Sequence, residues 1–199
     1  MNYFKHKAFL IAIFCATPYL SKAGKTELQV SFSTQISTIV VDKGALTLNS
    51  FQYKPDNNPI GVYLTAKNYI SHWISIGLSV GIFNDHGILD IDFTQRAGTY
   101  TRKNIVIAPE VGFTYFSEKN IKLYSFFGFG TRITSEQYTY DPGIGFAYAY
   151  DTTQTKANKF APIIQITPIA FRFGKNIGGF AEIGWGYKGI FNFGFFYKL

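Results

Sequence analysis

The chain is poor in cysteine, in charge and in long apolar runs. Its one cysteine among 199 residues is Cys15, inside an N-terminal segment that we expect to be removed. A mature chain without thiols has no disulfide, cysteine nucleophile or thiolate metal site. After that segment no run of about 20 apolar residues occurs, which excludes helical membrane spans. Only 16% of the residues are charged, while 47% are hydrophobic and 19% aromatic, which argues against disorder and fits one β-rich domain.

Residues 1–23 have the layout of a secretory signal peptide. Two lysines precede an apolar run at 8–20, and Ser21 and Ala23 are the small residues that a signal peptidase reads. We therefore expect cleavage after Ala23 and a single domain over 24–199. Cleavage removes three lysines and lowers the net charge from +7 to +4, so the basic balance gives no support for a nucleic-acid partner.

Alternation with a period of two dominates the rest of the chain. In the stretch ISIGLSVGIF at 74–83, the even positions are Ile, Leu or Val, and the odd positions before Phe83 are Ser or Gly. Similar alternation recurs at 27–36, 104–115, 123–133 and 181–199. This pattern predicts strands with one large apolar face and one face of small and polar residues.

Turn residues divide the chain into eight expected strands. Short polar connectors occur at 67–68, 117–120, 174–179 and 188–189, and long ones at about 39–58, 84–101 and 136–158. The strands are then expected at 26–38, 59–67, 70–83, 102–116, 121–135, 159–173, 178–187 and 190–199. The segment 159–173 is apolar on both faces and holds Pro162 and Pro168, so we expect a β-bulge or a register shift there.

The two faces together predict an inverted barrel. A soluble barrel turns its apolar face inward and needs abundant charge outside, which the Ser/Gly face of these strands lacks. If the apolar face meets lipid, the small residues line a narrow interior. The sequence therefore predicts an all-β fold, an eight-stranded antiparallel up-and-down transmembrane β-barrel, with a soluble barrel as the minor alternative.

Aromatic residues gather near the expected strand ends, where amphipathic rings favour the headgroup level of a membrane. Those near the short turns are Tyr69, Trp73, Tyr115, Phe116, Phe171, Phe173 and Tyr197, and those near the loops are Phe83, Tyr100, Trp185, Tyr187 and Phe191. We expect two interfacial girdles; ordinary packing of a β-rich protein is the alternative.

The segments KLYSFFGFGTRI at 122–133 and GFAEIGWGYKGIFNFGFFYKL at 179–199 carry a family resemblance. With the signal peptide, they resemble the small eight-stranded outer-membrane barrels of the OmpX and OmpW type, and most of all the outer-membrane β-barrel proteins of the porin family in Bacteroidetes. In such barrels the last strand holds an assembly signal, which is matched here by Asn192, Gly194, Tyr197 and Leu199, although the family typically ends in Phe. The resemblance implies localisation in the bacterial outer membrane, insertion by the barrel-assembly machinery, contact with outer-membrane lipid and lipopolysaccharide, and a monomer.

Three charged residues fall on the predicted inward face: Glu110, Arg132 and Glu182. Charges inside a narrow barrel must pair, because an isolated buried ion costs several kcal/mol. We interpret them as a structural salt-bridge cluster that fills the lumen; a polar path for a solute is the alternative. We expect no cofactor and no metal site.

The long loops hold the candidates for contact with a surface partner. Tyr138, Tyr140, Tyr148 and Tyr150 alternate around a turn at 141–143, and they face either a partner or the barrel rim. Asp85, Asp90 and Asp92 in the second loop match no complete metal-binding loop. His72 and His86 suggest lipid A chemistry, but no neighbouring residues complete a catalytic pattern.

Three functions remain open from the sequence. The first is a structural or surface-interaction role in envelope integrity or adhesion, and we do not expect an enzyme. The second is a passive conduit for a small and apolar solute, and the third is lipid A modification.

Overall fold

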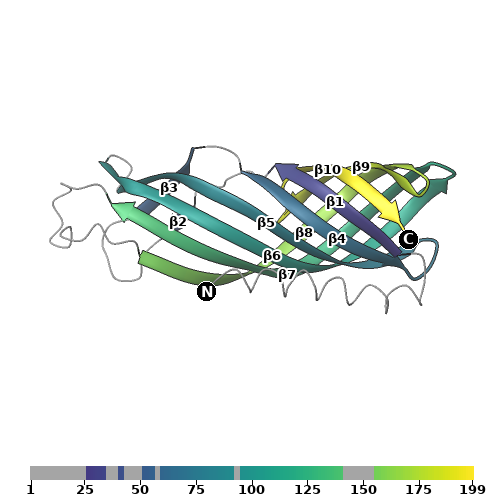
Figure 1. The fold of residues 1–199 in the computed structure, drawn as a ribbon, viewed down its shortest axis with the longest axis horizontal. Coiled ribbons are helices and arrows are strands. Elements are labelled where there is room, and N and C mark those ends of the chain that lie inside the picture. The colour runs from purple at the N-terminus through teal and green to yellow at the C-terminus, as the bar shows by residue number, and fades with distance from the viewer. Residues whose placement is uncertain (1–25, 35–39, 43–50, 57–58, 92–94, 141–154) are drawn as a thin grey trace.

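The computed structural model describes residues 26–34, 40–42, 51–56, 59–91, 95–140 and 155–199, and its strands wind into one closed barrel (Figure 1). The eight strands of the barrel are β1 (Thr26–Thr34), β4 (Ile60–Tyr69), β5 (Ile74–Ile91), β6 (Gln95–Glu118), β7 (Ile121–Tyr140), β8 (Thr155–Gly174), β9 (Ile177–Gly186) and β10 (Phe191–Lys198). Each barrel strand pairs antiparallel with its two neighbours, and β1 closes the barrel by pairing with both β4 and β10. The predicted all-β, eight-stranded antiparallel up-and-down barrel is confirmed. Among the residues described, no helix is long and apolar enough to cross a membrane.

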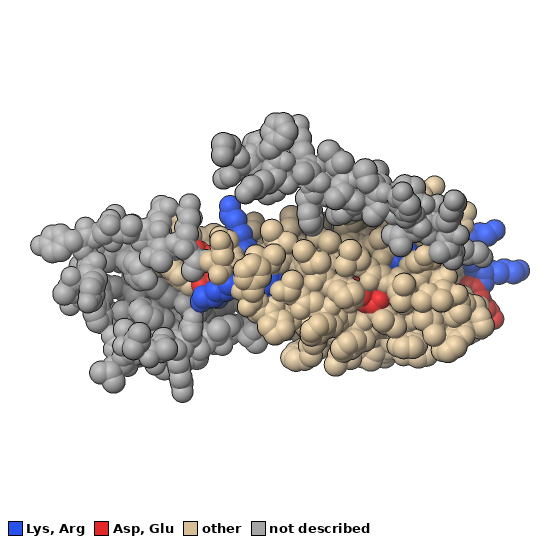
Figure 2. Space-filling model, turned by 90° about the horizontal axis from the view of Figure 1, so that it is seen from below, with Lys and Arg blue, Asp and Glu red and all other residues tan. Residues whose placement is uncertain are grey.

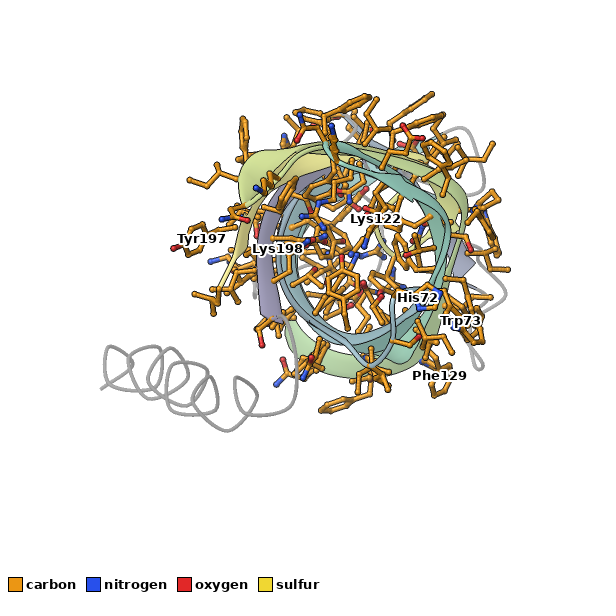
Figure 3. All side chains as sticks on the ribbon, turned by 90° about the vertical axis from the view of Figure 1, so that its right-hand side faces the viewer. His72, Trp73, Lys122, Phe129, Tyr197 and Lys198 are labelled. Carbon is orange, nitrogen blue, oxygen red and sulfur yellow. The ribbon has the colours of Figure 1, made fainter. Side chains whose placement is uncertain are left out.

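Alternation along the strands sorts side chains between the inside and the outside of the barrel. On β5, Ser75, Ser79 and Gly81 are buried, whereas Leu78 is 48% exposed and Ile82 is 59% exposed. The view along the barrel in Figure 3 likewise shows Trp73, Phe129 and Tyr197 outside the ring and Lys122 within it. The large apolar side chains on the outward face of the strands therefore form the exterior of the barrel.

The charged residues lie away from this apolar exterior. On the face seen in Figure 2, the exposed band is mostly tan with a small red patch, and the blue Lys and Arg side chains gather at its two borders, one beside the grey atoms and one at the right-hand end. Inside the barrel the pattern is reversed, because the buried polar and charged residues outnumber the buried hydrophobic ones. The interior is polar and the wall is apolar, as the alternation predicts.

Four barrel strands are longer than predicted at the end opposite the short turns. β5, β6, β7 and β8 continue through 84–91, 95–101, 136–140 and 155–158, which had been assigned to loops. A further hairpin of β2 (Val40–Asp42) and β3 (Phe51–Pro55) pairs with the outer part of β5. These segments extend the wall of the barrel well beyond its apolar band.

The first short turn also lies elsewhere than predicted. The connector was expected at Lys67 and Asn68, but β4 continues through both residues and the chain turns at 70–73. Lys67 looked like a turn residue because it is charged, yet its side chain is buried inside the barrel. The bulge expected in 159–173 is confirmed, since the register of β8 against β9 shifts between Ile166 and Ile169, on either side of Pro168.

Of the twelve residues expected in the aromatic girdles, eight point outward, as a girdle requires. The outward and exposed rings are Trp73, Tyr115, Phe116, Phe171, Phe173, Trp185, Phe191 and Tyr197. Four others point inward instead: Tyr69, Phe83, Tyr100 and Tyr187. Closeness to a strand end does not determine whether a ring points inward or outward. Successive side chains of a strand alternate between the two faces, so the position of the residue within that alternation determines it.

Candidate functional site

Three buried ion pairs fill the barrel interior, and they are the main candidate site of the protein. We call them the lumen cluster: Glu27 with Arg172, Glu182 with Lys67, and Glu110 with Lys188. Each of these six residues is at most 4% exposed. With three acids and three bases the cluster is formally neutral, which is what a dehydrated interior requires.

The first pair lies toward the short-turn end of the barrel. Arg172 of β8 forms an ion pair with Glu27 of β1, and its NH1 also donates a hydrogen bond of 3.0 Å to the Tyr69 hydroxyl. Glu27 accepts two further hydrogen bonds, from Gln29 Nε2 at 2.8 Å and from the Tyr69 hydroxyl at 3.2 Å. The Arg172 guanidinium also stacks 3.6 Å from the centre of the Phe196 ring. Both charges are thus fully engaged by groups from four strands.

The second pair is looser and relies on neutral donors. Glu182 of β9 accepts hydrogen bonds of 2.6 Å from the Tyr124 hydroxyl and 2.6 Å from Asn192 Nδ2. Lys67 Nζ lies 3.9 Å from Glu182 Oε1 and 5.0 Å from the centres of the Tyr124 and Phe126 rings. The lysine is therefore held as much by aromatic faces as by its carboxylate partner.

The third pair joins a turn to the barrel wall. Lys188 lies in the 187–190 turn, and its Nζ is 2.6 Å from Glu110 Oε1, which also accepts a 2.7 Å hydrogen bond from the Tyr187 hydroxyl. Gly186 (φ +138°) and Gly189 (φ +72°) give this turn a backbone that side-chain-bearing residues rarely adopt. The turn thereby folds Lys188 into the lumen, where it is 1% exposed.

A fourth group lies beyond the apolar band, in the extended part of the wall. Glu136 of β7 forms ion pairs of 3.0 Å with both Arg102 Nε and Lys159 Nζ, and it accepts a hydrogen bond from the Tyr138 hydroxyl. Burial by itself raises the pKa of Glu136, but the hydrogen bonds from Tyr138 and Lys159 and the charge of Arg102 outweigh it and hold the pKa below its usual value. The group ties β6, β7 and β8 together outside the band.

Two of the three residues of the predicted charge cluster lie in ion pairs inside the barrel, each with a base other than Arg132. Glu110 and Glu182 are buried inside the barrel, but no ion pair joins Arg132 to either of them, and its Nε is buried without a hydrogen-bond partner among the described residues. Gly128 is the neighbour of Glu110 in the register, and Arg132 lies four residues further along β7. Glu110 pairs with Lys188, and Glu182 pairs with Lys67. Arg172 is a further buried base, which pairs with Glu27, and its inward position on β8 was a signal that could have revealed it.

Three residues of the expected assembly signal, Asn192, Gly194 and Tyr197, lie on β10, and Leu199 directly follows that strand. Asn192 is buried and bonded to Glu182, and a Cβ at Gly194 would lie 2.0 Å from the Val30 carbonyl oxygen. Tyr197 and Leu199 are exposed on the outside, at 49% and 57%. Their role in assembly stays a prediction.

The other candidates fall into separate places. Tyr138 is not a surface-loop residue as predicted: it is 9% exposed and lies in β7, because the strand continues past 135. The backbone of Tyr140 ends β7, and Tyr148 and Tyr150 lie outside the described residues. His72 is exposed in the 70–73 turn before β5, and His86 is exposed in the outer part of β5. Among the described residues no three His, Cys, Asp or Glu side chains gather as a metal site; Asp92 is not among them.

Comparison with family models finds no match, and neither does comparison with curated proteins. Comparison with solved structures finds a similarity to Ail, the attachment invasion locus protein of Yersinia pestis, with a TM-score of 0.46 and 12% sequence identity. The similarity covers 88% of this chain and 97% of that chain. A similarity of this size carries no argument about function, and the barrel is defined by its own strand pairing.

Close packing inside the lumen predicts a strong effect of one added methyl group. A Cβ at Gly81 would lie 2.1 Å from Cδ1 and Cε1 of Tyr63, which is fully buried and donates a hydrogen bond to the Tyr187 carbonyl. We expect Gly81→Ala to lower the free energy of unfolding by about 1–3 kcal/mol, since the ring has nowhere to move. Urea unfolding in detergent micelles, followed by tryptophan fluorescence, measures the change.

Gly179→Ala is the matched control for this substitution. Its Cβ would meet only the Gly194 carbonyl oxygen, at 3.6 Å, so we expect no loss of stability. Equal destabilisation by the two alanines would show that strand glycines matter for a reason other than contact with Tyr63.

Proposed function

We propose that the chain is an integral protein of the bacterial outer membrane with a structural or surface-interaction role, in envelope integrity or adhesion. The observation that carries the proposal is the inversion of the barrel: charged residues are paired and buried inside, while large apolar side chains face outward. Insertion by the barrel-assembly machinery, contact with lipopolysaccharide and a monomeric state are parts of the same proposal.

The apolar exterior supports a lipid environment. Outward side chains such as Phe193, Phe195 and Trp185 are 55%, 68% and 64% exposed, and every barrel strand carries at least one exposed large hydrophobic residue. Soluble monomers rarely expose contiguous apolar patches larger than a few hundred Å². A bilayer covers such a wall without the cost of exposing it to water.

The two ends of the barrel support an orientation. The first barrel strand begins at Thr26 and the last one finishes at Lys198. Both residues lie on the side of the barrel that holds the turns at 70–73, 119–120 and 175–176. Barrels of the outer membrane have short periplasmic turns and longer external loops. We assign this end to the periplasm, and the extended wall with the β2–β3 hairpin and the Glu136 group to the outer surface, where a partner would bind.

The filled lumen supports a role without conduction. The lumen cluster and the bulky side chains of Tyr63, Phe126 and Tyr187 occupy the interior, and an eight-stranded barrel has room for little else. We expect purified protein in a planar bilayer to give no discrete conductance steps at a voltage at which a general porin, added as the positive control, does. Reproducible steps that scale with salt concentration would favour the conduit.

Membrane integration has its own test. We expect the protein to stay in the membrane fraction after carbonate washing and to change its mobility in SDS gels on boiling, because all strand edges of a closed barrel are hydrogen-bonded. Release by carbonate without a mobility shift would mean a soluble barrel. Lipid A modification remains the alternative activity, and mass spectra of lipid A from cells with and without the protein test it, with His86→Ala as the control.

A further inference from the structure

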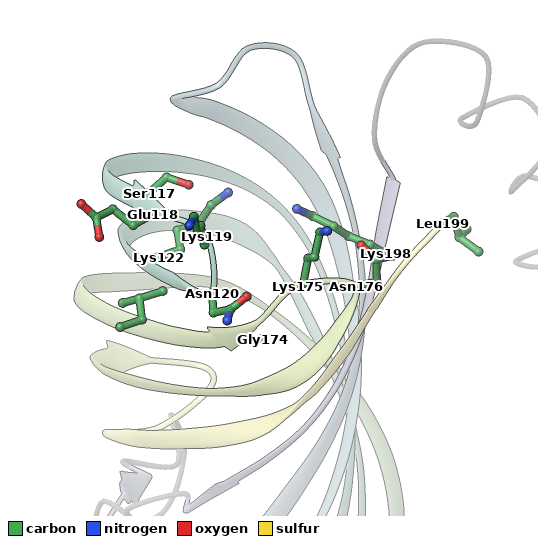
Figure 4. A pocket seen from close by; sticks show the side chains of 11 residues that line it. Ser117, Glu118, Lys119, Asn120, Lys122, Gly174, Lys175, Asn176, Lys198 and Leu199 are labelled. Carbon is green, nitrogen blue, oxygen red and sulfur yellow. The ribbon is translucent and has the colours of Figure 1, made fainter.

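A basic pocket opens at the short-turn end of the barrel, apart from the lumen cluster. It encloses about 300 Å³ between the 119–120 turn, the 175–176 turn and the end of β10. Four lysines line it, Lys119, Lys122, Lys175 and Lys198, against the single acidic side chain of Glu118. Figure 4 shows the side chains of Lys122, Lys175 and Lys198 around the same opening.

The backbone that carries these lysines is fixed by hydrogen bonds between turns. Gly174 N donates to the Asn120 carbonyl at 2.8 Å, and Lys198 N donates to the Asn176 carbonyl at 2.7 Å. Arg172, itself locked by Glu27, donates from NH2 to the Lys175 carbonyl at 3.3 Å. The pocket is therefore held in shape by the barrel wall before any ligand arrives, which lowers the entropy cost of binding.

The lysines that line the pocket outnumber its one acidic side chain, Glu118. Lys122 is half-buried, and within the described part of the chain it forms no ion pair; its ammonium group lies 3.9 Å from the centre of the Tyr69 ring. Both oxygens of the buried acid Glu27 are taken by Arg172, Tyr69 and Gln29. A surplus of ammonium groups around a small preformed opening is a site for an anion with several oxygen acceptors.

We propose that this pocket binds a phosphate group, presented by the headgroup of an anionic phospholipid in the adjacent leaflet. The lipid source follows from the proposed membrane location: Ile121, Phe173 and Ile177, on the outside of the same turns, are 47%, 54% and 70% exposed and meet the bilayer at the same level. Free inorganic phosphate shares the recognition chemistry, and experiment separates the two sources.

Isothermal titration of the folded protein in uncharged detergent micelles tests the proposal at low ionic strength. The probes are dihexanoyl-phosphatidylglycerol, inorganic phosphate and dihexanoyl-phosphatidylcholine, with empty micelles as the blank. We expect saturable binding of the anionic lipid that weakens with added salt. We expect Lys122→Gln to weaken it by about tenfold or more, which corresponds to the loss of one charge-assisted contact.

The matched control is Lys103→Gln, which removes the same charge from an exposed position on β6 near the other end of the barrel. Lys175→Gln, in a surface turn, is a second test should Lys122→Gln not fold, and the mobility shift on boiling checks folding of each variant. Equal affinity for inorganic phosphate and for the anionic lipid would retain the phosphate site and reject the lipid as its source. Lack of binding by the folded, heat-modifiable protein, or equal loss in Lys103→Gln, would overturn the proposal and leave the membrane location standing.

Discussion

Replacing Glu110 by alanine is expected to lower the free energy of unfolding of the barrel by about 3–5 kcal/mol, because it leaves the Lys188 ammonium buried without a carboxylate. Lys188 is 1% exposed, and its Nζ lies 2.6 Å from Glu110 Oε1. Its remaining contacts are a 3.4 Å hydrogen bond to Thr65 and the Phe126 ring, 4.8 Å from its nitrogen. Urea unfolding in lipid vesicles, followed by tryptophan fluorescence, measures the effect.

Two further variants separate the loss of the charge pair from other causes. Glu118→Ala removes a carboxylate from an exposed position at the end of β6, and we expect a change within about 0.5 kcal/mol. Glu110→Leu combined with Lys188→Met removes both charges, and we expect it to recover most of the stability, because apolar isosteres carry no desolvation penalty. A loss below about 1 kcal/mol in Glu110→Ala would mean that Lys188 finds another partner or water, and that the lumen is more open than its packing indicates.

Placing a charge on the outer wall is the second substitution with a large expected effect. Leu78 lies in the middle of the apolar part of β5 and is 48% exposed, with Ala66 and Pro109 as its cross-strand neighbours. If lipid covers this wall, we expect Leu78→Lys to lower the free energy of unfolding in vesicles by about 2–4 kcal/mol, the cost of a lysine near the bilayer midplane. If water covered it, the same substitution would be neutral or favourable.

Ile60→Lys is the depth control for that experiment. Ile60 is 66% exposed at the end of β4 away from the short turns, two residues beyond the level of Ile82. There we expect a loss of only about 0–1 kcal/mol, since lysine reaches the interface. Equal effects at the two positions would argue against a bilayer around the barrel and would reopen the soluble alternative.

The fold could be predicted because its signal is local. The period of two in 74–83 places Leu78 and Ile82 on one face and Ser79 and Gly81 on the other, whichever strands lie beside them. The bulge near Pro168 was predictable for a related reason, since proline removes a donor from the ladder. The extended wall was missed because its segments do not alternate: 84–91 begins with four polar or small residues and then has apolar residues on both faces, and 95–101 is mostly polar. Strands without a clear alternation carry a weak pattern.

The partners inside the lumen were harder to predict because they depend on register and depth. Glu110 and Glu182 were assigned to the interior from parity alone, which is a property of each strand. The same alternation placed Arg132 inside the barrel, yet Arg132 is the partner of neither glutamate. Glu110 pairs with Lys188, which comes from a turn, and Glu182 pairs with Lys67, which resembled a turn residue in the sequence. Which charge meets which depends on the stagger between strands that are far apart in the sequence.

By itself the sequence determined that this chain forms strands with an apolar outer face, that eight of them close into a barrel, and that charges lie inside it. Those properties follow from the pleat of the backbone and from the burial preferences of single residues. Only the tertiary structure decided that Lys188 enters the lumen from a turn and that Arg172 forms its ion pair with Glu27. It also decided that four lysines line one pocket at the short-turn end. These arrangements bring together β1, β6, β7, β8 and β10, and closure of the barrel sets the distances among them.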